Sequence, residues 1–234
     1  MPRTTENMFT YNYCLQDTQI RLLRLLPGSD DQEFIGCLLA VDFDRNASPQ
    51  YEALSYTWGK PLFDAAIFFN DDQSDGLARK FKITTDLAVA LRHLRRADKE
   101  RILWIDQICI NQHDATEKST QVNNMMADIY RRTSALIVWL GAADSETGIA
   151  FDTIEGTYQS LPKGPGLSYQ ERIALRREHM VEPSTGVFNA IEWRAVYNLL
   201  RRPWFERTWI VQEAYLAELD GTKTTVLCGG YYVD

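Results

Sequence analysis

The sequence predicts an α/β fold in which a largely parallel sheet is flanked by helices. One observation is a pair of apolar runs, at residues 101–106 and 135–141, separated by a segment with helical periodicity. This arrangement indicates a βαβ unit. Both runs are also apolar on consecutive residues, which is the pattern of parallel strands buried on both faces. Asp106 ends the first run. It either caps the following turn or places a carboxylate at the carboxyl edge of a central strand, where open α/β sheets bind ligands.

The composition indicates one soluble domain in a reducing compartment. The chain has 234 residues, 45% of them hydrophobic, and a chain of this size buries roughly 70% of its unfolded surface without needing a disulfide or a metal. The net charge of −7 argues against nucleic acid or an anionic membrane as a partner. Its four cysteines are widely spaced and form no CxxC pair, which is typical of reducing compartments. No signal peptide or apolar run of ~20 residues is present, so we expect a cytoplasmic protein without a membrane span.

The N-terminal part predicts extra strands ahead of the βαβ unit. Residues 1–10 are polar and expected to be disordered, and residues 11–234 are expected to form a single domain. Strands are predicted at residues 20–26, 34–41, 51–58, 65–69 and 80–83. The first two flank a Pro-Gly-Ser-Asp-Asp turn, and the last two flank a loop that contains Asp and Gly, which suggests a hairpin.

Helical periodicity follows these strands. Thr85 is a plausible N-cap for a helix that buries Leu87, Leu91 and Leu94. The helix of the βαβ unit carries Val122, Met125 and Ile129 on one face. This stripe favours core packing over a cofactor site.

The C-terminal part predicts a helical insertion at residues 142–201. Asp144 is expected to cap its first helix, residues 161–166 to form a loop, and residues 169–180 and 191–200 to be helical. The insertion ends at Pro203, because proline cannot continue a helix. A helix at 205–216 and a strand at 224–228 follow. Because the chain stops directly after a strand, we expect it to be the N-terminal module of a longer protein.

Glu213 is the first candidate functional residue. On a helix it shares one face with Trp209 and Leu216, so its carboxylate is either partly buried or lines a cleft. A buried carboxylate without a partner is costly, which makes a functional role plausible. The alternative is a structural ion pair with Arg202 or Arg207.

A second candidate is the sequence Ser55-Tyr56-Thr57-Trp58-Gly59, which closes an apolar strand. Aromatic rings at the carboxyl end of a strand can stack on a flat ligand, and glycine lets the backbone approach it closely. The alternative is that the rings only fill the core.

Other motifs are weaker. Cys109 and His113 lack the further groups that a nucleophilic or metal site needs, so a structural cysteine and a loop histidine are favoured. Asp42 and Asp44 resemble the DxD motif of metal-dependent sugar transferases, a motif that is common by chance. No GxGxxG or GxxxxGK[ST] is present, and no metal site is expected.

Three blocks together resemble the fungal heterokaryon-incompatibility (HET) domain. They are residues 51–59, residues 103–141, and Arg202-Pro203-Trp204-Phe205 through Gln212-Glu213. The resemblance extends over residues 11–234. Lys118 stands where the family more often has arginine, and residues 142–201 lack family motifs, as expected of a variable insertion.

The resemblance implies a module that triggers cell death when genetically different hyphae fuse, often at the N-terminus of larger receptor-like proteins. The family is distantly similar to Toll/interleukin-1 receptor (TIR) domains, which implies a TIR- or flavodoxin-like core. Residues 53–56 are similar to the Phe-Ile-Ser-Tyr end of the first TIR strand. Residues 209–213 are similar to the TIR Trp-Cys-x-x-Glu helix, whose glutamate is catalytic in NAD-cleaving members. Ile210 replaces the cysteine of that motif, so no role of the cysteine is carried over.

NAD hydrolysis to nicotinamide and ADP-ribose products is the activity that this resemblance implies, with NAD as substrate and no cofactor. Glu213 would be the catalytic residue, because a carboxylate stabilises an oxocarbenium-like centre. The substrate-binding candidates are Ser55, Tyr56, Trp58, Gly59, Asp106 and Trp209. Relatives often act only when assembled, so a homo-oligomer is expected on activation. The alternatives are a non-enzymatic TIR-like signalling module and a transferase that uses Asp42 and Asp44.

Overall fold

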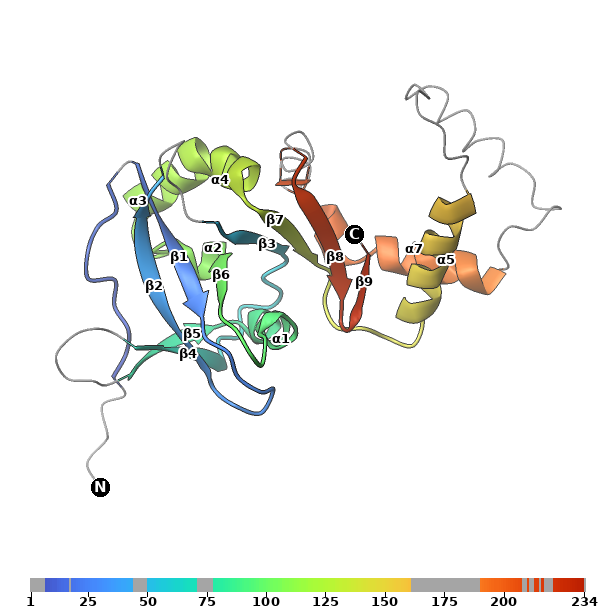
Figure 1. Cartoon of the computed structure of the whole chain (residues 1–234), viewed down its shortest axis with the longest axis horizontal. Coiled ribbons are helices and arrows are strands. Elements are labelled where there is room, and N and C mark those ends of the chain that lie inside the picture. The colour runs from blue at the N-terminus through green and yellow to red at the C-terminus, as the bar shows by residue number, and fades with distance from the viewer. Residues whose placement is uncertain are drawn as a thin grey trace.

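The computed structural model describes residues 7–16, 18–43, 50–70, 78–160, 190–207, 210, 213, 214, 216 and 221–233. Within them the chain forms a mixed sheet of nine strands in the order β5-β4-β2-β1-β6-β3-β7-β8-β9, accompanied by helices (Figure 1). The strands are β1 (Gln19–Leu25), β2 (Phe34–Asp42), β3 (Glu52–Tyr56), β4 (Ala65–Asn70), β5 (Ala78–Ile83), β6 (Arg101–Trp104), β7 (Ala135–Trp139), β8 (Lys223–Cys228) and β9 (Tyr231–Val233). The α/β class is confirmed.

The prediction of a largely parallel sheet is wrong. Four of the eight strand pairings are antiparallel, and β1 is antiparallel to both of its neighbours, β2 and β6. Strand β1 contains Gln19, Arg21 and Arg24, and five of its seven residues are nonetheless buried. Burial along a strand therefore does not report strand direction here.

A parallel group, β6-β3-β7-β8, lies within this sheet. Strands β6 and β7 are both parallel to β3, which lies between them. The predicted βαβ unit is present, with one strand inserted in its middle. Across the sheet these strands lie in the order second, first, third and fourth, numbered by their order in the chain. Because all four are parallel, their carboxyl ends meet at one edge.

The N-terminal segment packs against the far end of the sheet. Met8 forms a parallel bridge with Lys80, and the Phe9 amide donates to the Lys80 carbonyl at 2.9 Å. The Phe9 ring makes edge contacts with Tyr11 and Phe81. The start of the stretch expected to be disordered, residues 1–6, lies outside the described residues.

The helices before β7 show two local departures from the prediction. Helix α1 (Thr85–Leu94) is capped by Thr84, whose side chain accepts from the Leu87 amide, one residue earlier than expected. The single helix expected before β7 consists of α3 (Ala115–Thr120), a π-helical turn at Gln121–Met125, and α4 (Met126–Arg132). The π-helical turn changes the helical register, so Met126 and Tyr130 join the buried set beside Ile129.

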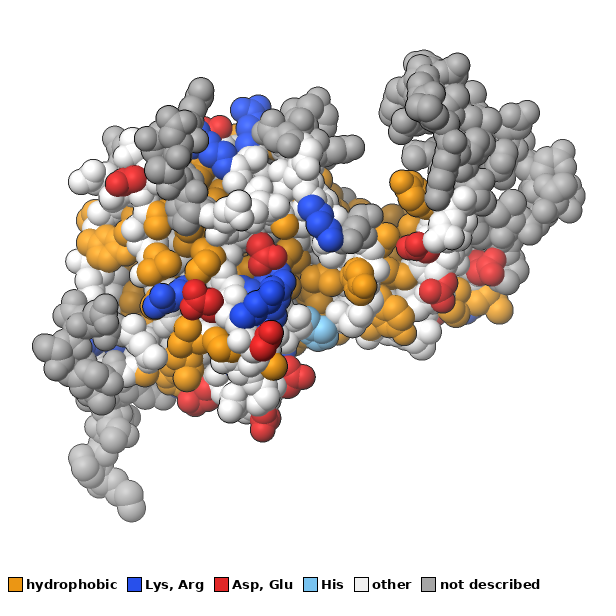
Figure 2. Space-filling view, in the orientation of Figure 1, with side chains coloured by type: hydrophobic (Ala, Val, Ile, Leu, Met, Phe, Trp, Pro, Cys, Tyr) orange, Lys and Arg blue, Asp and Glu red, His pale blue; other side chains and the backbone are white. Residues whose placement is uncertain are grey.

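Two helices of the predicted insertion are seen, α5 (Thr147–Ser160) and α7 (Ala190–Leu200). They pack on each other, and α5 contacts the edge strand β9 (Figure 1). Hydrophobic side chains gather over the narrow part of the molecule that leads to them (Figure 2). The loop expected at 161–166 and the helix at 169–180 lie outside the described residues. No helix among the described residues is long and apolar enough to cross a bilayer.

A buried ion pair holds the loop after β6 in place. Arg21 of β1 is 1% exposed and its guanidinium contacts both carboxylate oxygens of Glu117 in α3, at 3.1 Å for one of them. Glu117 also accepts from the backbone amide of Asn111 at 2.7 Å. The pair therefore fixes the segment between α2 (Asp106–Cys109) and α3.

Candidate functional site

The candidate site is built at the shared carboxyl edge of the parallel strands. Ser55 and Tyr56 end β3 and lie opposite Val138 and Trp139 of β7. Asp106 follows β6 and begins α2. Strand β3 lies inside the sheet, with a neighbour on each side. Its last residues point into the space where the chain returns after α7.

Glu213 enters this space from a helical turn near the C-terminus. Residues 210, 213, 214 and 216 are helical, after a 3-10 turn at Pro203–Glu206 and an extended Arg207. The Glu213 side chain is 2% exposed, and its Oε2 accepts a short hydrogen bond from the Ser55 hydroxyl. The Ser55 oxygen in turn accepts from the Trp204 indole at 2.8 Å. Ser55 thus joins the end of β3 to both C-terminal segments.

Arg207 is the cation that lies next to Glu213. Its guanidinium lies 3.6 Å from Glu213 Oε1 and donates to the Tyr56 carbonyl at 2.6 Å. Glu213 Oε1 is buried and accepts no hydrogen bond from the residues that the structure describes. Burial raises the pKa of Glu213, while the Ser55 hydrogen bond and the Arg207 charge act in the opposite direction. Of the two ion-pair partners considered from the sequence, Arg207 is the one found, because Arg202 pairs with Asp144.

Asp106 and Trp58 form a second unit. The Trp58 indole donates to both carboxylate oxygens of Asp106, at 3.0 and 2.9 Å. The backbone amide of Gln107 donates to the same carboxylate at 2.7 Å. Burial raises the pKa of Asp106 to about 6, against the effects of the Trp58 hydrogen bond and of Arg207, and Glu213 adds to the rise. Asp106 is the first residue of α2 and not its cap, since the N-cap position is Ile105. Its carboxylate lies just after β6, at the carboxyl edge of the parallel strands, which is the other position that the sequence allowed.

A cavity of about 380 Å³ lies against these residues. Its polar lining comes from Thr57, Trp58, Asp106, Gln112, Lys118 and Arg207, and its apolar lining from Ile110, Val122 and Met126. One carboxylate and two cations thus face the same hollow. A small ligand that carries both a positive and a negative charge would find partners here.

Two tyrosines lie close to the carboxylates. Tyr56 and Tyr130 are 1% and 2% exposed, and burial raises the pKa of both hydroxyls, with Asp106 contributing in each case. The Tyr56 hydroxyl has no hydrogen-bond partner among the described residues. Both phenols are therefore neutral, and neither is a base.

The structure brings together most of the predicted site residues, at different depths. Trp58 and Asp106 line the cavity, whereas Ser55, Tyr56 and Glu213 are buried and are not among the lining residues. Gly59 has φ of +68°, and a Cβ there would lie 1.6 Å from an oxygen of Asp86. Its glycine requirement comes from the positive φ and from this contact within the protein. Trp209 lies outside the described residues.

The residues of the site that were not predicted as binding residues include Lys118, Arg207 and Trp204. Arg207 was considered only as an ion-pair partner, and Lys118 only as a variation on the family pattern. Their positive charges in segments already matched to the family were the available signal. Trp204 belongs to a block matched to the family, but its contact with Ser55 spans 149 residues of chain, which no local pattern encodes.

The weaker motifs lie apart from this cavity. Cys109 is buried, burial raises the pKa of its thiol to about 12, and His113 is exposed. Asp42 ends β2 and accepts from Gln19 at 3.0 Å, while Asp44 lies outside the described residues. In the part of the chain that the structure describes, no three His, Cys, Asp or Glu side chains are placed to hold a metal.

Comparison with known proteins gives two matches. A family model described as heterokaryon incompatibility protein (HET) matches residues 51–213. The chain is similar to heterokaryon incompatibility protein 6, OR allele, of Neurospora crassa, with 33% identity over 250 aligned positions. That alignment covers 97% of the chain and 36% of the relative, so the chain spans about a third of the relative's length. No solved structure gives a significant match.

Proposed function

Because the chain belongs to the heterokaryon incompatibility family, we propose that it is a cytoplasmic cell-death effector domain of fungal allorecognition that hydrolyses NAD. The products are nicotinamide and ADP-ribose species, and Glu213 is the catalytic carboxylate. A TIR-like core is part of this proposal. It is supported by the order of the parallel strands, second-first-third-fourth, which is the order at the start of a flavodoxin-like sheet.

The observation that carries the proposal is the position of Glu213. Its carboxylate lies at the end of β3, bonded to Ser55, and Arg207 connects it to a cavity bordered by Trp58 and Asp106. Burial of a carboxylate costs free energy that a purely structural role rarely justifies. Within the described part of the chain one of its oxygens has no hydrogen-bond donor, which leaves an acceptor available for a ligand.

The chemistry of the bond from nicotinamide to ribose suits this set of charges. The leaving group is already cationic, so no general acid is required, and positive charge develops on the ribose as the bond breaks. A carboxylate at that position acts on the transition state more than on the ground state. Trp58 offers a ring on which nicotinamide can stack.

Access to Glu213 requires Arg207 to turn toward the cavity. Arg207 is 23% exposed and its ion pair with Glu213 is long, at 3.6 Å. The phosphates of NAD are better partners for a guanidinium than one distant carboxylate oxygen, because they accept bidentate hydrogen bonds. Substrate binding would thereby free Glu213 Oε1 to meet the ribose.

Nicotinamide release from NAD by the purified protein tests the proposal. Glu213→Gln keeps a side chain of the same size and an acceptor for Ser55, and it should lower turnover by roughly 100-fold or more. Glu206→Gln is the matched control, because Glu206 is exposed on the neighbouring turn, and it should retain full turnover. The proposal includes activation by self-association, so the assay is run over a range of concentrations and on clustered protein. Absence of turnover under all of these conditions refutes it.

A non-enzymatic signalling module is the second candidate, and one observation favours it. Glu213 is not among the residues that line the cavity, and both of its oxygens face protein partners, Ser55 and Arg207. This is also the arrangement of a structural ion pair. If Glu213→Gln retains full toxicity in cells while the protein stays folded, the signalling function replaces the hydrolase.

A further inference from the structure

A larger cavity lies next to the candidate site. Its volume is about 700 Å³, and it shares Trp58 and Gln112 with the smaller cavity beside Asp106. The indole of Trp58 is held by Asp106 through two hydrogen-bond distances of 3.0 and 2.9 Å. One fixed aromatic ring therefore borders two neighbouring hollows.

The two hollows differ in chemistry. The smaller contains the Asp106 carboxylate with Lys118 and Arg207. The larger has aromatic walls from Phe9, Tyr11, Phe63 and Phe81, in addition to Trp58. The rings of Phe9, Tyr11 and Phe81 make edge contacts with one another and form a preorganised wall.

The polar residues of the larger cavity, which include Thr10 and His113, suit an uncharged flat ring with a phosphate attached. Amides from Gln107, Asn111 and Gln112 reach the lining, as do Lys80 and Lys82. No carboxylate lines this cavity among the described residues. A purine stacks on aromatic side chains, its edge exchanges hydrogen bonds with amides, and its phosphate pairs with lysine.

We propose that the larger cavity binds the adenosine phosphate half of a dinucleotide, while the smaller cavity takes the nicotinamide ribotide half. Trp58 is the partition between the two halves. The placement of the nicotinamide ribotide half in the smaller cavity rests on the proposed NAD hydrolysis. The placement of the adenosine phosphate half rests on the lining of the larger cavity alone. Both volumes lie within the range of about 300 to 1,000 Å³ that is usual for ligand sites.

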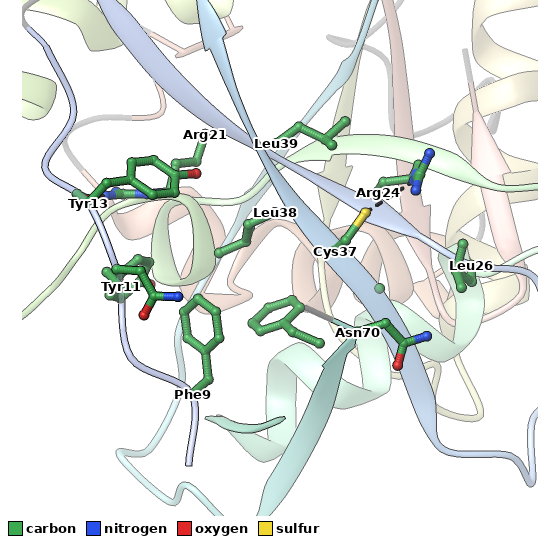
Figure 3. A pocket seen from close by; sticks show the side chains of 13 residues that line it. Phe9, Tyr11, Tyr13, Arg21, Arg24, Leu26, Cys37, Leu38, Leu39 and Asn70 are labelled. Atoms are coloured by element: carbon green, nitrogen blue, oxygen red, sulfur yellow. Dashed lines mark hydrogen bonds between the residues drawn. The ribbon is translucent and has the colours of Figure 1, made fainter. Parts of the chain in front are cut away.

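A third cavity, of about 290 Å³, is excluded from this assignment. It lies on the other side of Phe9 and Tyr11, which line both cavities. Figure 3 shows Phe9, Tyr11 and Tyr13 on one extended segment, across from Arg24 and Cys37 of β1 and β2. It shares neither Trp58 nor Gln112 with the candidate site, so it is not continuous with it.

Direct binding measured by titration calorimetry tests the assignment, with AMP, adenosine and nicotinamide mononucleotide as separate probes. Phe63→Ala should weaken AMP and adenosine binding by about tenfold and leave nicotinamide mononucleotide unchanged. Phe63 is 42% exposed, so its removal does not threaten the core. Leu62→Ala is the matched control, because Leu62 is 51% exposed on the same loop and does not line the cavity.

Lysine variants separate the phosphate from the ring. Lys82→Gln should weaken AMP binding several-fold and leave adenosine unchanged, whereas Lys60→Gln, outside the cavity, should change neither. Absence of AMP binding, or equal AMP binding by Phe63→Ala and the unchanged protein, overturns the assignment even if NAD is hydrolysed. AMP binding that depends on Phe63, without any NAD turnover, supports the cavity assignment and refutes the hydrolase instead.

Discussion

Ser55 is the residue on which the buried polar contacts of the site converge. Its hydroxyl donates to Glu213 and accepts from the Trp204 indole at 2.8 Å. Ser55→Ala leaves both partners buried without a hydrogen bond, so we expect the free energy of unfolding to fall by about 1 to 3 kcal/mol in urea denaturation. Ser134→Ala is the control, since Ser134 also donates to a carbonyl but is exposed, and water can replace its hydroxyl. Equal losses in the two variants would contradict a buried network at Ser55.

Asp106 gives a prediction about pH. Its folded-state pKa is about 6, above the ~3.9 of an unfolded aspartate. Between these values the folded protein binds more protons at Asp106 than the unfolded chain does. The contribution of Asp106 to the free energy of unfolding therefore falls as pH rises through that window. Asp106→Asn removes this penalty. The stability of the variant relative to the unchanged protein should therefore grow between pH 4 and pH 7, on the order of 1 kcal/mol after allowance for solvent screening.

Urea denaturation at several pH values measures this difference. Asp98→Asn is the control for loss of one charge, because Asp98 is exposed and distant in sequence from the cavity. Stability curves for Asp106→Asn and the unchanged protein that stay parallel between pH 4 and pH 7 would show that the Asp106 pKa is not raised.

At the scale of elements, the ion pair between β1 and α3 should matter more than pairs on the surface. The side chains of Arg21 and Glu117 are 1% and 7% exposed. Glu117→Gln leaves the Arg21 charge buried without its partner, and we expect a loss of about 3 to 5 kcal/mol in the free energy of unfolding. Glu146→Gln breaks the exposed pair with Arg194 and should cost about 1 kcal/mol or less. Similar losses in thermal or urea unfolding would contradict the prediction.

Elements with strong local patterns could be predicted from the sequence, and their pairings could not. Strands appear where expected at β1, β6 and β7. Strand direction does not follow from burial, because most residues are buried in the antiparallel β1 as well as in the parallel β7. The π-helical turn at Gln121–Met125 also leaves no clear trace in the spacing of apolar residues.

Only part of the candidate site could be predicted from the sequence, because local patterns identify single residues and not the contacts between distant ones. Glu213 and Asp106 could be chosen locally, since a carboxylate among apolar residues is unusual wherever it occurs. The contact between Ser55 and Glu213 joins residues 158 positions apart, which no local pattern encodes. Burial of Ser55 and Tyr56 below the cavity depends on where the chain returns after α7, and only the fold supplies that.

For the molecule as a whole, the parallel and antiparallel parts of the mixed sheet have different roles. The parallel strands β6, β3, β7 and β8 bring their carboxyl ends together at the candidate site. The antiparallel strands β1 and β2 and the hairpin β4–β5 extend the sheet on one side and supply Phe81, Lys80 and Lys82 to the larger cavity. The additional N-terminal strands therefore enlarge the proposed binding region beyond the edge of the parallel group.

The helices α5 and α7 should be the least stable part of this assembly. They pack on each other, α5 also packs on the edge strand β9, and they expose Tyr158 and Tyr197 at 70% and 57%. Elements with little buried contact open locally at a lower free energy than core strands. We expect their amides to exchange with deuterium at least about tenfold faster than those of β3 and β7 in native-state exchange followed by mass spectrometry.

Arg202 should limit how far this opening spreads. It donates to the Leu140 and Ala142 carbonyls, at 3.1 and 2.8 Å, and pairs with Asp144. These bonds anchor the chain directly after α7, so the amides at 204–207 should keep the slow exchange of the core while α7 exchanges quickly. In Arg202→Ala the fast exchange should extend into 204–207. If α5 and α7 instead exchange as slowly as β3, the helices and the sheet open as one cooperative unit, and the candidate site is no more protected than the rest of the molecule.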